Sequence, residues 1–308
     1  MRTMKRRILV GTRGSSLALA QTSHVVESLR KLEPSVQYQV VPIKTRGDKM
    51  HDVGTTAVEG KSLFTKEIED SLIKGQVDMA VHSMKDLTTD LPTGLVIAAV
   101  PERANPRDVL ISRDKKKFEQ LPGRARVGTS SARRKAQLLA ARGDLEIVDM
   151  HGNVDTRLRK LEKGEYDAIV LAAAGLIRLG LGKHATEFLS TEVVLPAVGQ
   201  GALAIQSRDG DSEMRDLLSH LDHKPTRRAI EAERAFARRL SANCRTPIAA
   251  YARLEDGKLA IDGMVASPTG KLLVRSRIIS DNPDAGKVGE ELAESLLEKG
   301  AEIVLEAA

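Results

Sequence analysis

The stretch RILVGTRGSS, residues 7–16, passes from apolar residues through two glycines into a segment with helical spacing at 17–32. Residues 126–134, RVGTSSARR, repeat the same order of short apolar run, glycine- and hydroxyl-rich turn, and helix start. A short apolar run that ends in such a turn and is followed by a period of 3.6 residues predicts a strand leading into a helix. The two stretches therefore predict two α/β units.

Strand and helix patterns alternate outward from the first stretch. Residues 36–43 alternate as a strand, and residues 77–81 and 95–100 form further apolar runs. Between the first two of these strands, apolar residues that recur every four positions from Phe64 to Leu72 predict one helix face. This order is the βαβ pattern of an α/β unit.

The second stretch is the centre of a similar unit. A helix predicted at 154–163 separates strands predicted at 145–150 and 166–173. Prolines at both ends of residues 101–106 predict a hinge before this unit, and the glycine-rich residues 196–201 predict a flexible crossing after it.

The pattern changes after Pro225. A helix is predicted at 226–240, and three strand-like runs follow at 248–254, 258–266 and 271–279, separated by glycine-containing turns. Apolar residues then recur at helical spacing near the C-terminus. This order predicts a small α+β domain.

The composition is that of an ordinary chain of more than one domain. The 308 residues exceed what one hydrophobic core usually supports, and tryptophan is absent. The 48 basic against 42 acidic residues give a net charge of +6, which suits nucleic acid, a membrane surface or an acidic small molecule. Scattered arginines and few aromatic residues make nucleic acid the weaker interpretation.

Apolar runs in this sequence are short. The basic residues 1–7 are followed by three apolar residues before Gly11, which is too few for a signal peptide, and the run at 168–177 is too short to span a membrane. With one cysteine, no disulfide pair is available. We therefore expect a cytoplasmic protein.

Three turns at predicted strand ends carry features of anion sites. Residues 11–16, 128–134 and 151–157 each combine backbone N–H groups at a helix start with hydroxyl or amide side chains and arginine. Such groups bind carboxylates or phosphates, although a serine at a helix start is more often simply an N-cap. Three together favour a polyanionic ligand in a cleft between two α/β units.

Cys244 is the only thiol, so it forms no internal disulfide. A lone cysteine is usually a small core residue. Here residues 241–243 are small or polar and Arg245 is adjacent, which is typical of an electropositive, partly exposed setting that makes thiolate available. The loop therefore predicts covalent chemistry.

Asp86 ends the segment His82-Ser83-Met84-Lys85-Asp86, which follows the strand predicted at 77–81. It is either a turn residue, a partner for Lys85, or a functional carboxylate. In an arginine-lined cleft, one carboxylate can handle protons and stabilise a cationic intermediate. We interpret His82 as structural.

These segments together resemble the porphobilinogen deaminase family, also called hydroxymethylbilane synthases. The resemblance runs in order along essentially the whole chain and is carried by residues 12–13 and 16–19, 45–48, 82–86, 127–131 and 133–134, 152–153 and 156–157, 195–201 and the Cys244 loop.

The resemblance implies a transferase with a dipyrromethane cofactor attached through Cys244. Such an enzyme adds four porphobilinogen molecules head to tail, loses ammonia at each addition, and releases the linear tetrapyrrole hydroxymethylbilane. It also implies that Asp86 contacts pyrrole N–H groups, assists deamination and stabilises an azafulvene-type cation.

Other site residues follow from the same resemblance. The expected cofactor-binding residues besides Cys244 are Ser83, Lys85, Thr129, Ser131, Arg133, Arg134 and Gly152. The expected substrate-binding residues are Arg13, Lys61, His151, Arg157, Arg178 and Gln200. No metal site is expected.

Each pyrrole brings two carboxylates, and arginine is a permanently charged partner for them. His151 stands where the family normally has arginine, and Ala57 stands where some members have a lysine.

The expected fold is α/β, with two lobes like those of periplasmic binding proteins and a smaller α+β C-terminal domain. The expected boundaries are 1–101 with 202–220, 106–196, and 224–308. We expect a monomer that acts on porphobilinogen and binds neither nucleic acid nor membranes. The alternatives are an anion-binding or sensor protein with the same two lobes and, less favoured, a nucleic-acid-binding protein.

Overall fold

The computed structural model describes residues 7–48, 64–241 and 247–306. The chain divides into two units, and it passes from one to the other three times. Unit 1 comprises residues 1–103 and 202–227, and unit 2 comprises residues 104–201 and 228–308.

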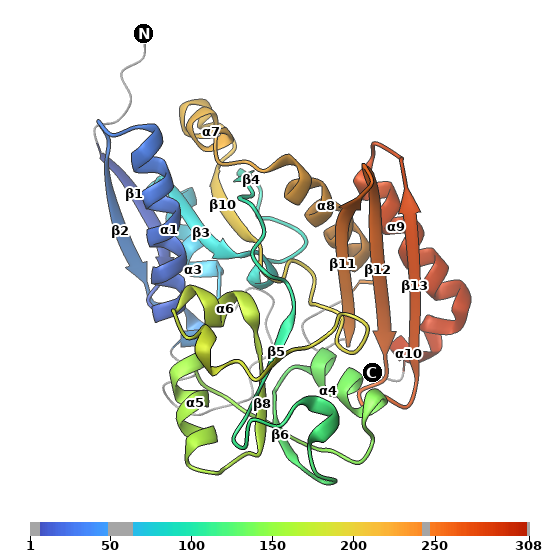
Figure 1. The fold of residues 1–308 in the computed structure, drawn as a ribbon. Helices are drawn as coiled ribbons and strands as arrows, with labels where there is room; N and C mark the ends of the chain where they lie inside the picture. Colours follow the sequence, from blue (N-terminus) through green and yellow to red (C-terminus); the bar gives the residue numbers. More distant parts are fainter. Residues whose placement is uncertain (1–6, 49–63, 242–246, 307–308) are drawn as a thin grey trace. The chain divides into compact units, whose positions relative to one another are not determined.

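Unit 1 is a five-stranded sheet with helices on both faces, and Figure 1 shows helix α1 lying beside strands β1 and β3. The order across the sheet is β2-β1-β3-β10-β4. Strand β10 runs antiparallel to both of its neighbours, β3 and β4, whereas β1 runs parallel to β2 and β3. The elements are β1 (Arg7–Arg13), α1 (Ser16–Leu32), β2 (Gln37–Ile43), α3 (Lys66–Ile73), β3 (Met79–Ser83), the 3₁₀ turn η1 (Met84–Asp86), β4 (Leu95–Ala99), β10 (Leu203–Arg208) and α7 (Ser212–Ser219).

Both faces of this sheet are apolar because helices cover both of them. Val25 and Leu29 of α1 pack with Ile8 and Val10 on one face, while Ile68 of α3 packs on the other face. Apolar residues on both faces are typical of strands buried in α/β sheets.

Unit 2 contains a second five-stranded sheet in the order β7-β6-β8-β5-β9. Helix α4 packs in the core on one face and α5 in the core on the other. The elements are β5 (Asp108–Ser112), η2 (Phe118–Gln120), β6 (Arg126–Gly128), α4 (Ala132–Ala141), β7 (Glu146–Val148), α5 (Val154–Glu162), β8 (Ala168–Ala172), α6 (Ala173–Arg178), η3 (Gly182–His184) and β9 (Glu187–Phe188).

The rest of unit 2 is α+β. Figure 1 shows an antiparallel sheet of β11, β12 and β13 with helices α8 and α9 beside it. The elements are α8 (Lys224–Arg239, which begins in unit 1), β11 (Ile248–Glu255), β12 (Lys258–Ala266), β13 (Leu273–Ser280), α9 (Ala285–Leu296), η4 (Leu297–Ala301) and α10 (Glu302–Glu306).

The mixed α/β fold with a smaller C-terminal α+β part agrees with the sequence prediction. Strand β3 differs in detail, because it begins at Met79 and extends to Ser83, so that His82 and Ser83 lie within the strand. No helix in the described part of the chain is long and apolar enough to cross a membrane.

Candidate active site

Asp86 lies in the 3₁₀ turn that directly follows β3. Its Oδ2 lies 3.7 Å from Nη1 of Arg13, which is the last residue of the parallel strand β1. Because β1 and β3 are neighbours in the sheet, their carboxyl ends bring these two side chains together. The carboxylate side chain is 28% exposed, so a ligand can reach it.

Arg13 is held in place from two sides. Its Nε and Nη2 donate to Oδ1 of Asp48 at 3.2 and 2.6 Å, and its guanidinium lies 4.1 Å from the centre of the Phe64 ring. Thr45 donates its hydroxyl to the other Asp48 oxygen at 2.7 Å. Burial raises the pKa of Asp48, but the hydrogen bonds from Arg13 and Thr45 outweigh it and lower the pKa. These contacts fix the orientation of the Arg13 guanidinium beside Asp86.

A cavity of about 80 Å³ adjoins Asp86 and Arg13. Ser83 and Lys85 also line it. The Ser83 hydroxyl exchanges hydrogen bonds with the Gln21 amide at 3.0 and 3.1 Å, and Lys85 is exposed. Unit 1 thus brings together four of the predicted residues.

Arg133 and Arg134, in the first turn of α4, share one buried carboxylate. Nη1 of Arg133 donates to Oδ2 of Asp108 at 2.7 Å, and Nε and Nη2 of Arg134 donate to Oδ1 at 2.9 and 2.6 Å. Asp108 is completely buried, and both arginines are 6% exposed. Burial alone would raise the pKa of Asp108, but attraction to the two guanidinium groups lowers it to about 2.

Gln200 completes this buried network. Its Nε2 donates to Oδ1 of Asp108 at 3.1 Å and to the Pro106 carbonyl at 2.7 Å, while its Oε1 lies 3.5 Å from Nη2 of Arg133. Its side chain is therefore directed toward the two arginines. The sequence grouped Gln200 with the substrate-binding residues, and the structure places it beside the predicted cofactor-binding arginines.

Arg157 adds a further positive charge. Its Nε donates to the Gly152 carbonyl at 2.8 Å. Burial, followed by repulsion from Arg134, lowers its pKa to about 10. Arg133, Arg134 and Arg157 together exceed the single negative charge of Asp108 by two. Such an excess of desolvated positive charge favours an anionic ligand.

Arg178 lies at the end of α6. Its Nη2 donates to the Gly201 carbonyl at 3.0 Å, and burial lowers its pKa. The hydrogen bond connects Arg178 to the segment that carries Gln200. This hydrogen bond orients the Arg178 guanidinium. Because the carbonyl is uncharged, the bond does not neutralise the positive charge.

Each of the three predicted anion turns contains the N-cap residue of the helix that follows it. Ser15 accepts from the Ala18 N–H, Ser131 from the Arg134 N–H, and Asn153 from the Thr156 N–H. Capping does not exclude a ligand, because an N-cap satisfies only part of the free N–H groups of the first turn. The caps explain why these residue types occur at these positions.

Two further turn residues have defined surroundings. Thr129 is 1% exposed, and its Oγ1 accepts from the Ser131 N–H at 3.2 Å. Gly152 has φ of 116°, and a Cβ there would lie 2.8 Å from Cγ2 of Thr156, so glycine is required.

His151 is exposed, and its carbonyl lies 3.5 Å from Nζ of Lys160. Its assignment to substrate binding stays a prediction. The predicted Lys61 and Cys244, and Ala57, lie outside the described residues. Among the residues that are described, no group of three or more His, Cys, Asp or Glu side chains could hold a metal ion.

Sequence reasoning missed Asp48 and Asp108 as site residues. Asp48 ends the segment 45–48, which had been noted, but its contact with Arg13 joins positions 35 residues apart. Asp108 begins strand β5, which was not predicted. A charged residue at the start of the apolar run 109–111 is the signal that could have identified it.

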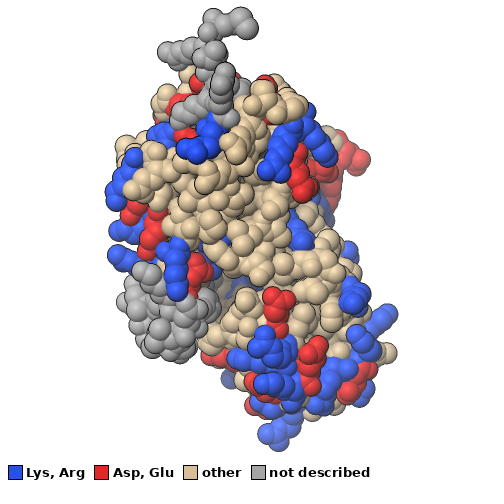
Figure 2. All heavy atoms as spheres, turned by 90° about the vertical axis from the view of Figure 1, so that its left-hand side faces the viewer, with Lys and Arg blue, Asp and Glu red and all other residues tan. Residues whose placement is uncertain are grey.

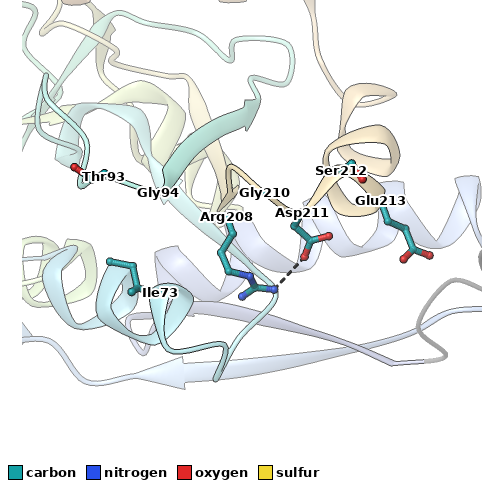
Figure 3. Close-up of a pocket in the computed structure, with 8 residues that line it drawn as sticks. All are labelled: Ile73, Thr93, Gly94, Arg208, Gly210, Asp211, Ser212 and Glu213. Carbon is teal, nitrogen blue, oxygen red and sulfur yellow. Dashed lines mark hydrogen bonds and ion pairs between the residues drawn. The ribbon is translucent and has the colours of Figure 1, made fainter.

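A larger hollow, of about 490 Å³, lies elsewhere on unit 1 (Figure 3). Figure 3 shows Arg208 directed toward Asp211 beside it, at 3.0 Å. Arg208 also donates to the carbonyls of Leu72 and Val77 at 3.0 and 2.9 Å. Arg208 and Asp211 therefore bind each other, and none of the predicted site residues lines this hollow.

Figure 2 shows charges of both signs on one face of the protein. On the face drawn in Figure 2, lysine and arginine side chains are interspersed with aspartate and glutamate. Nucleic-acid-binding proteins instead collect their basic residues in a patch or stripe. That face offers little support for nucleic-acid binding.

Comparison with protein families identifies two matching domains. Residues 8–216 match the model described as porphobilinogen deaminase, dipyromethane cofactor binding domain, and residues 228–298 match the porphobilinogen deaminase C-terminal domain.

Curated relatives agree over nearly the full chain. A porphobilinogen deaminase of Pelotomaculum thermopropionicum is 49% identical over 99% of this chain and 98% of its own, and one of Thermus thermophilus is 49% identical over 97% and 98%.

Solved structures are similar at a lower level. The methionine binding protein MetQ gives a TM-score of 0.44 at 13% identity, covering 70% of this chain and 89% of its own. A periplasmic domain of BvgS from Bordetella pertussis gives 0.40 at 16% identity, covering 69% and 84%.

Proposed function

Because the chain belongs to the porphobilinogen deaminase family, we propose that it condenses four porphobilinogen molecules head to tail and releases hydroxymethylbilane and ammonia. In this proposal it is a transferase, and a dipyrromethane attached to Cys244 is the primer. The observation that carries the proposal is the division of charge between two groups of residues: the partly exposed carboxylate of Asp86 beside Arg13 in unit 1, and an excess of arginine in unit 2.

The arginines of unit 2 fit an anionic cofactor. Asp108 neutralises one of the three charges of Arg133, Arg134 and Arg157, and burial makes the remaining charge costly without a counterion. Propionate and acetate groups supply such counterions, and guanidinium groups bind them through paired hydrogen bonds. Arg133, Arg134 and Arg157 would hold the dipyrromethane carboxylates, with Thr129, Ser131 and Gly152 shaping the turns beside them.

The dipyrromethane, when bound, supplies a nucleophilic pyrrole carbon to which the first substrate is joined. The residues of the protein would bind and orient the substrate. Arg13 would grip a substrate carboxylate while its pairing with Asp48 fixes the direction of its guanidinium. Arg178 and Lys61 would contribute further positive charge.

Asp86 would act on the reacting atoms of the substrate. Loss of ammonia leaves a positively charged methylene carbon conjugated with the pyrrole ring. A carboxylate held beside that ring stabilises the charge and can accept the pyrrole N–H. Arg13 lies 3.7 Å from this carboxylate and orients it.

We further propose that the protein acts as a monomer in the cytoplasm. The presence of one cysteine in 308 residues supports a reducing compartment. Size-exclusion chromatography with light scattering tests the monomer, for which a mass near 33.4 kDa is expected.

The stoichiometry of turnover tests the proposed reaction. Purified protein incubated with porphobilinogen should release four ammonia molecules for each linear tetrapyrrole formed. An anion-binding or sensor protein with the same fold would bind porphobilinogen and release no ammonia. Ammonia release without a tetrapyrrole product would also contradict the proposal.

A further inference from the structure

A row of buried polar side chains lies behind the Asp86 cavity. His82 on β3 is 5% exposed, Gln206 on β10 is completely buried, and Glu69 on α3 is 2% exposed. His82 pairs with Ala204 and Gln206 pairs with Ala80 in the antiparallel ladder, so both side chains project from the same face of the sheet. This is the face that α3 covers.

The row has a defined direction of hydrogen bonding. Glu69 accepts from the Thr65 hydroxyl at 3.3 Å and from Nε2 of Gln206 at 3.1 Å. The amide of Gln206 is thereby oriented with its oxygen away from Glu69. That Oε1 and Nε2 of His82 are both buried and have no hydrogen-bond partner.

Nε2 of His82 can donate a hydrogen bond and Oε1 of Gln206 can accept one, so the two unpaired atoms could pair with each other. Leaving a buried donor or acceptor unpaired is costly. The two side chains are close enough to interact. Their hydrogen bonding raises the pKa of His82, although burial lowers it by more. A small rotation that lets Nε2–H of His82 donate to Oε1 of Gln206 satisfies both atoms and fixes the tautomer. Nδ1 is then a hydrogen-bond acceptor.

His82 also lines the cavity that contains Asp86 and Arg13. Nε2 is enclosed, so the opposite edge of the ring, with Nδ1, is the edge available to a ligand. Arg13 and Lys85 offer only donors to that cavity. Ser15, Gln21, Thr65 and Ser83 also line the cavity, and each already takes part in a hydrogen bond within the protein. A substrate that carries N–H groups therefore also meets two acceptors of different kinds, the charged Asp86 and the neutral ring of His82.

We propose that His82 contacts the substrate, with Nδ1 accepting a hydrogen bond from the aminomethyl ammonium group of porphobilinogen, and that Gln206 and Glu69 are positioning residues for the ring. This inference rests on the proposed function and adds a binding role for a residue that the sequence suggested was structural.

The chemistry favours a weakly basic acceptor at this place. Deamination breaks the bond between the methylene carbon and nitrogen, the electron pair leaves with nitrogen as neutral ammonia, and the positive charge passes to the methylene carbon. The nitrogen must keep its three protons until that step. Burial, aided by repulsion from Arg13, lowers the pKa of His82 to about 4, so the ring holds the ammonium without removing its proton.

Two amide substitutions at His82 distinguish the roles of the two ring nitrogens. The amide of His82→Gln lies near the position of Nε2 and can still bond Gln206, whereas the amide of His82→Asn lies near the position of Nδ1 and leaves Gln206 unpaired. We expect His82→Gln to keep a melting temperature close to wild type and to lose roughly tenfold or more in kcat/KM. His82→Asn should melt lower and yet exceed His82→Gln in kcat/KM.

A residue that only packs would give the opposite relation, with activity following melting temperature in both variants. That result would overturn the proposal. Gln206→Met supplies the control for positioning: it removes the partner of Nε2 and should lower kcat/KM while leaving cofactor mass unchanged.

An analogue with a hydroxyl in place of the amine tests which substrate group is bound. The penalty of His82→Gln should be several-fold smaller for this analogue, because a neutral hydroxyl makes a weaker hydrogen bond than an ammonium. An equal penalty for both compounds would contradict the amine contact. If the wild-type protein itself released no ammonia, the proposed function would fail, and that outcome is distinct from either result with the variants.

Discussion

At the scale of single residues, burial gives two carboxylates different roles. Asp108 is completely buried between Arg133 and Arg134, whereas the side chain of Asp86 is 28% exposed and lies 3.7 Å from one arginine. The first can only balance charge, because its oxygens are occupied by internal donors. The second remains free to meet a ligand.

The role of Asp86 predicts a large kinetic effect of Asp86→Asn. The amide keeps the size and removes the negative charge, so we expect the variant to fold and to lose on the order of a hundredfold or more in kcat. Steady-state assays of product formation measure this loss. Asp114→Asn, at a side chain that is 63% exposed, is the control and should keep wild-type kinetics. Near wild-type turnover by Asp86→Asn would move the catalytic role to another group.

The role of Asp108 predicts an effect on stability. Asp108→Asn leaves two buried guanidinium groups without a counterion, which should lower the free energy of unfolding by about 3–5 kcal/mol at neutral pH. Chemical denaturation measures this difference. Asp209→Asn breaks an exposed ion pair with Arg215 and should change stability by less than about 1 kcal/mol.

Asp108 also makes the stability of the protein depend on pH, with stability falling as the pH is lowered. The folded-state pKa of Asp108 is about 2, lowered from 3.8, so its contribution is present above pH 4 and is lost as pH falls toward 2. The wild-type protein should therefore lose about 2 kcal/mol more than Asp108→Asn between pH 5 and pH 2. Parallel pH profiles of the two proteins would refute the assignment.

At the scale of elements, the alternating pattern of the sequence was sufficient for most helices and strands. Helix α1 begins at Ser16 and was predicted from 17, because a serine cap and a regular apolar face mark it. Strand β5 was missed because only three apolar residues separate the charged Asp108 from Ser112. Its buried charge is stabilised by arginines of α4, a tertiary contact that local periodicity does not record.

The candidate site was predictable in part for the same reason. Arg13, Asp86, Arg133 and Arg134 lie at strand ends or helix starts, where sequence patterns are informative. The partners that orient them, Asp48 and Asp108, are distant in sequence. Residue type and spacing predicted these four residues as site residues but could not identify the two partners.

Helices α8 and α9 approach each other closely at Gly289, where a Cβ would lie 2.1 Å from the Ala232 carbonyl oxygen. Gly289→Ala should therefore destabilise the protein by about 1–3 kcal/mol, although alanine is intrinsically the better helix former. Gly286→Ala on the same helix, whose Cβ would lie 3.2 Å from an Asp284 side-chain oxygen, is the matched control and should be neutral or slightly stabilising. Equal thermal stability of the two variants would contradict the close packing.

At the scale of the whole molecule, the proposed site residues are distributed over both units. Asp86 and Arg13 belong to unit 1, and Arg133, Arg134 and Arg157 belong to unit 2. Both units are built from separate segments of the chain. The separation of residues 224–308 as a third domain stays a prediction.

The central claim is that Cys244 carries a covalent dipyrromethane. A thiolate is a far better nucleophile than a serine hydroxyl near neutral pH, so Cys244→Ser should fail to attach the cofactor. Intact-protein mass spectrometry of the wild-type protein and Cys244→Ser measures this directly. We predict a mass increment equal to one dipyrromethane on the wild-type protein, located at Cys244 by peptide mapping, and the plain polypeptide mass with no turnover for Cys244→Ser. A wild-type protein of plain polypeptide mass that still forms hydroxymethylbilane, or an active Cys244→Ser protein, would contradict the claim.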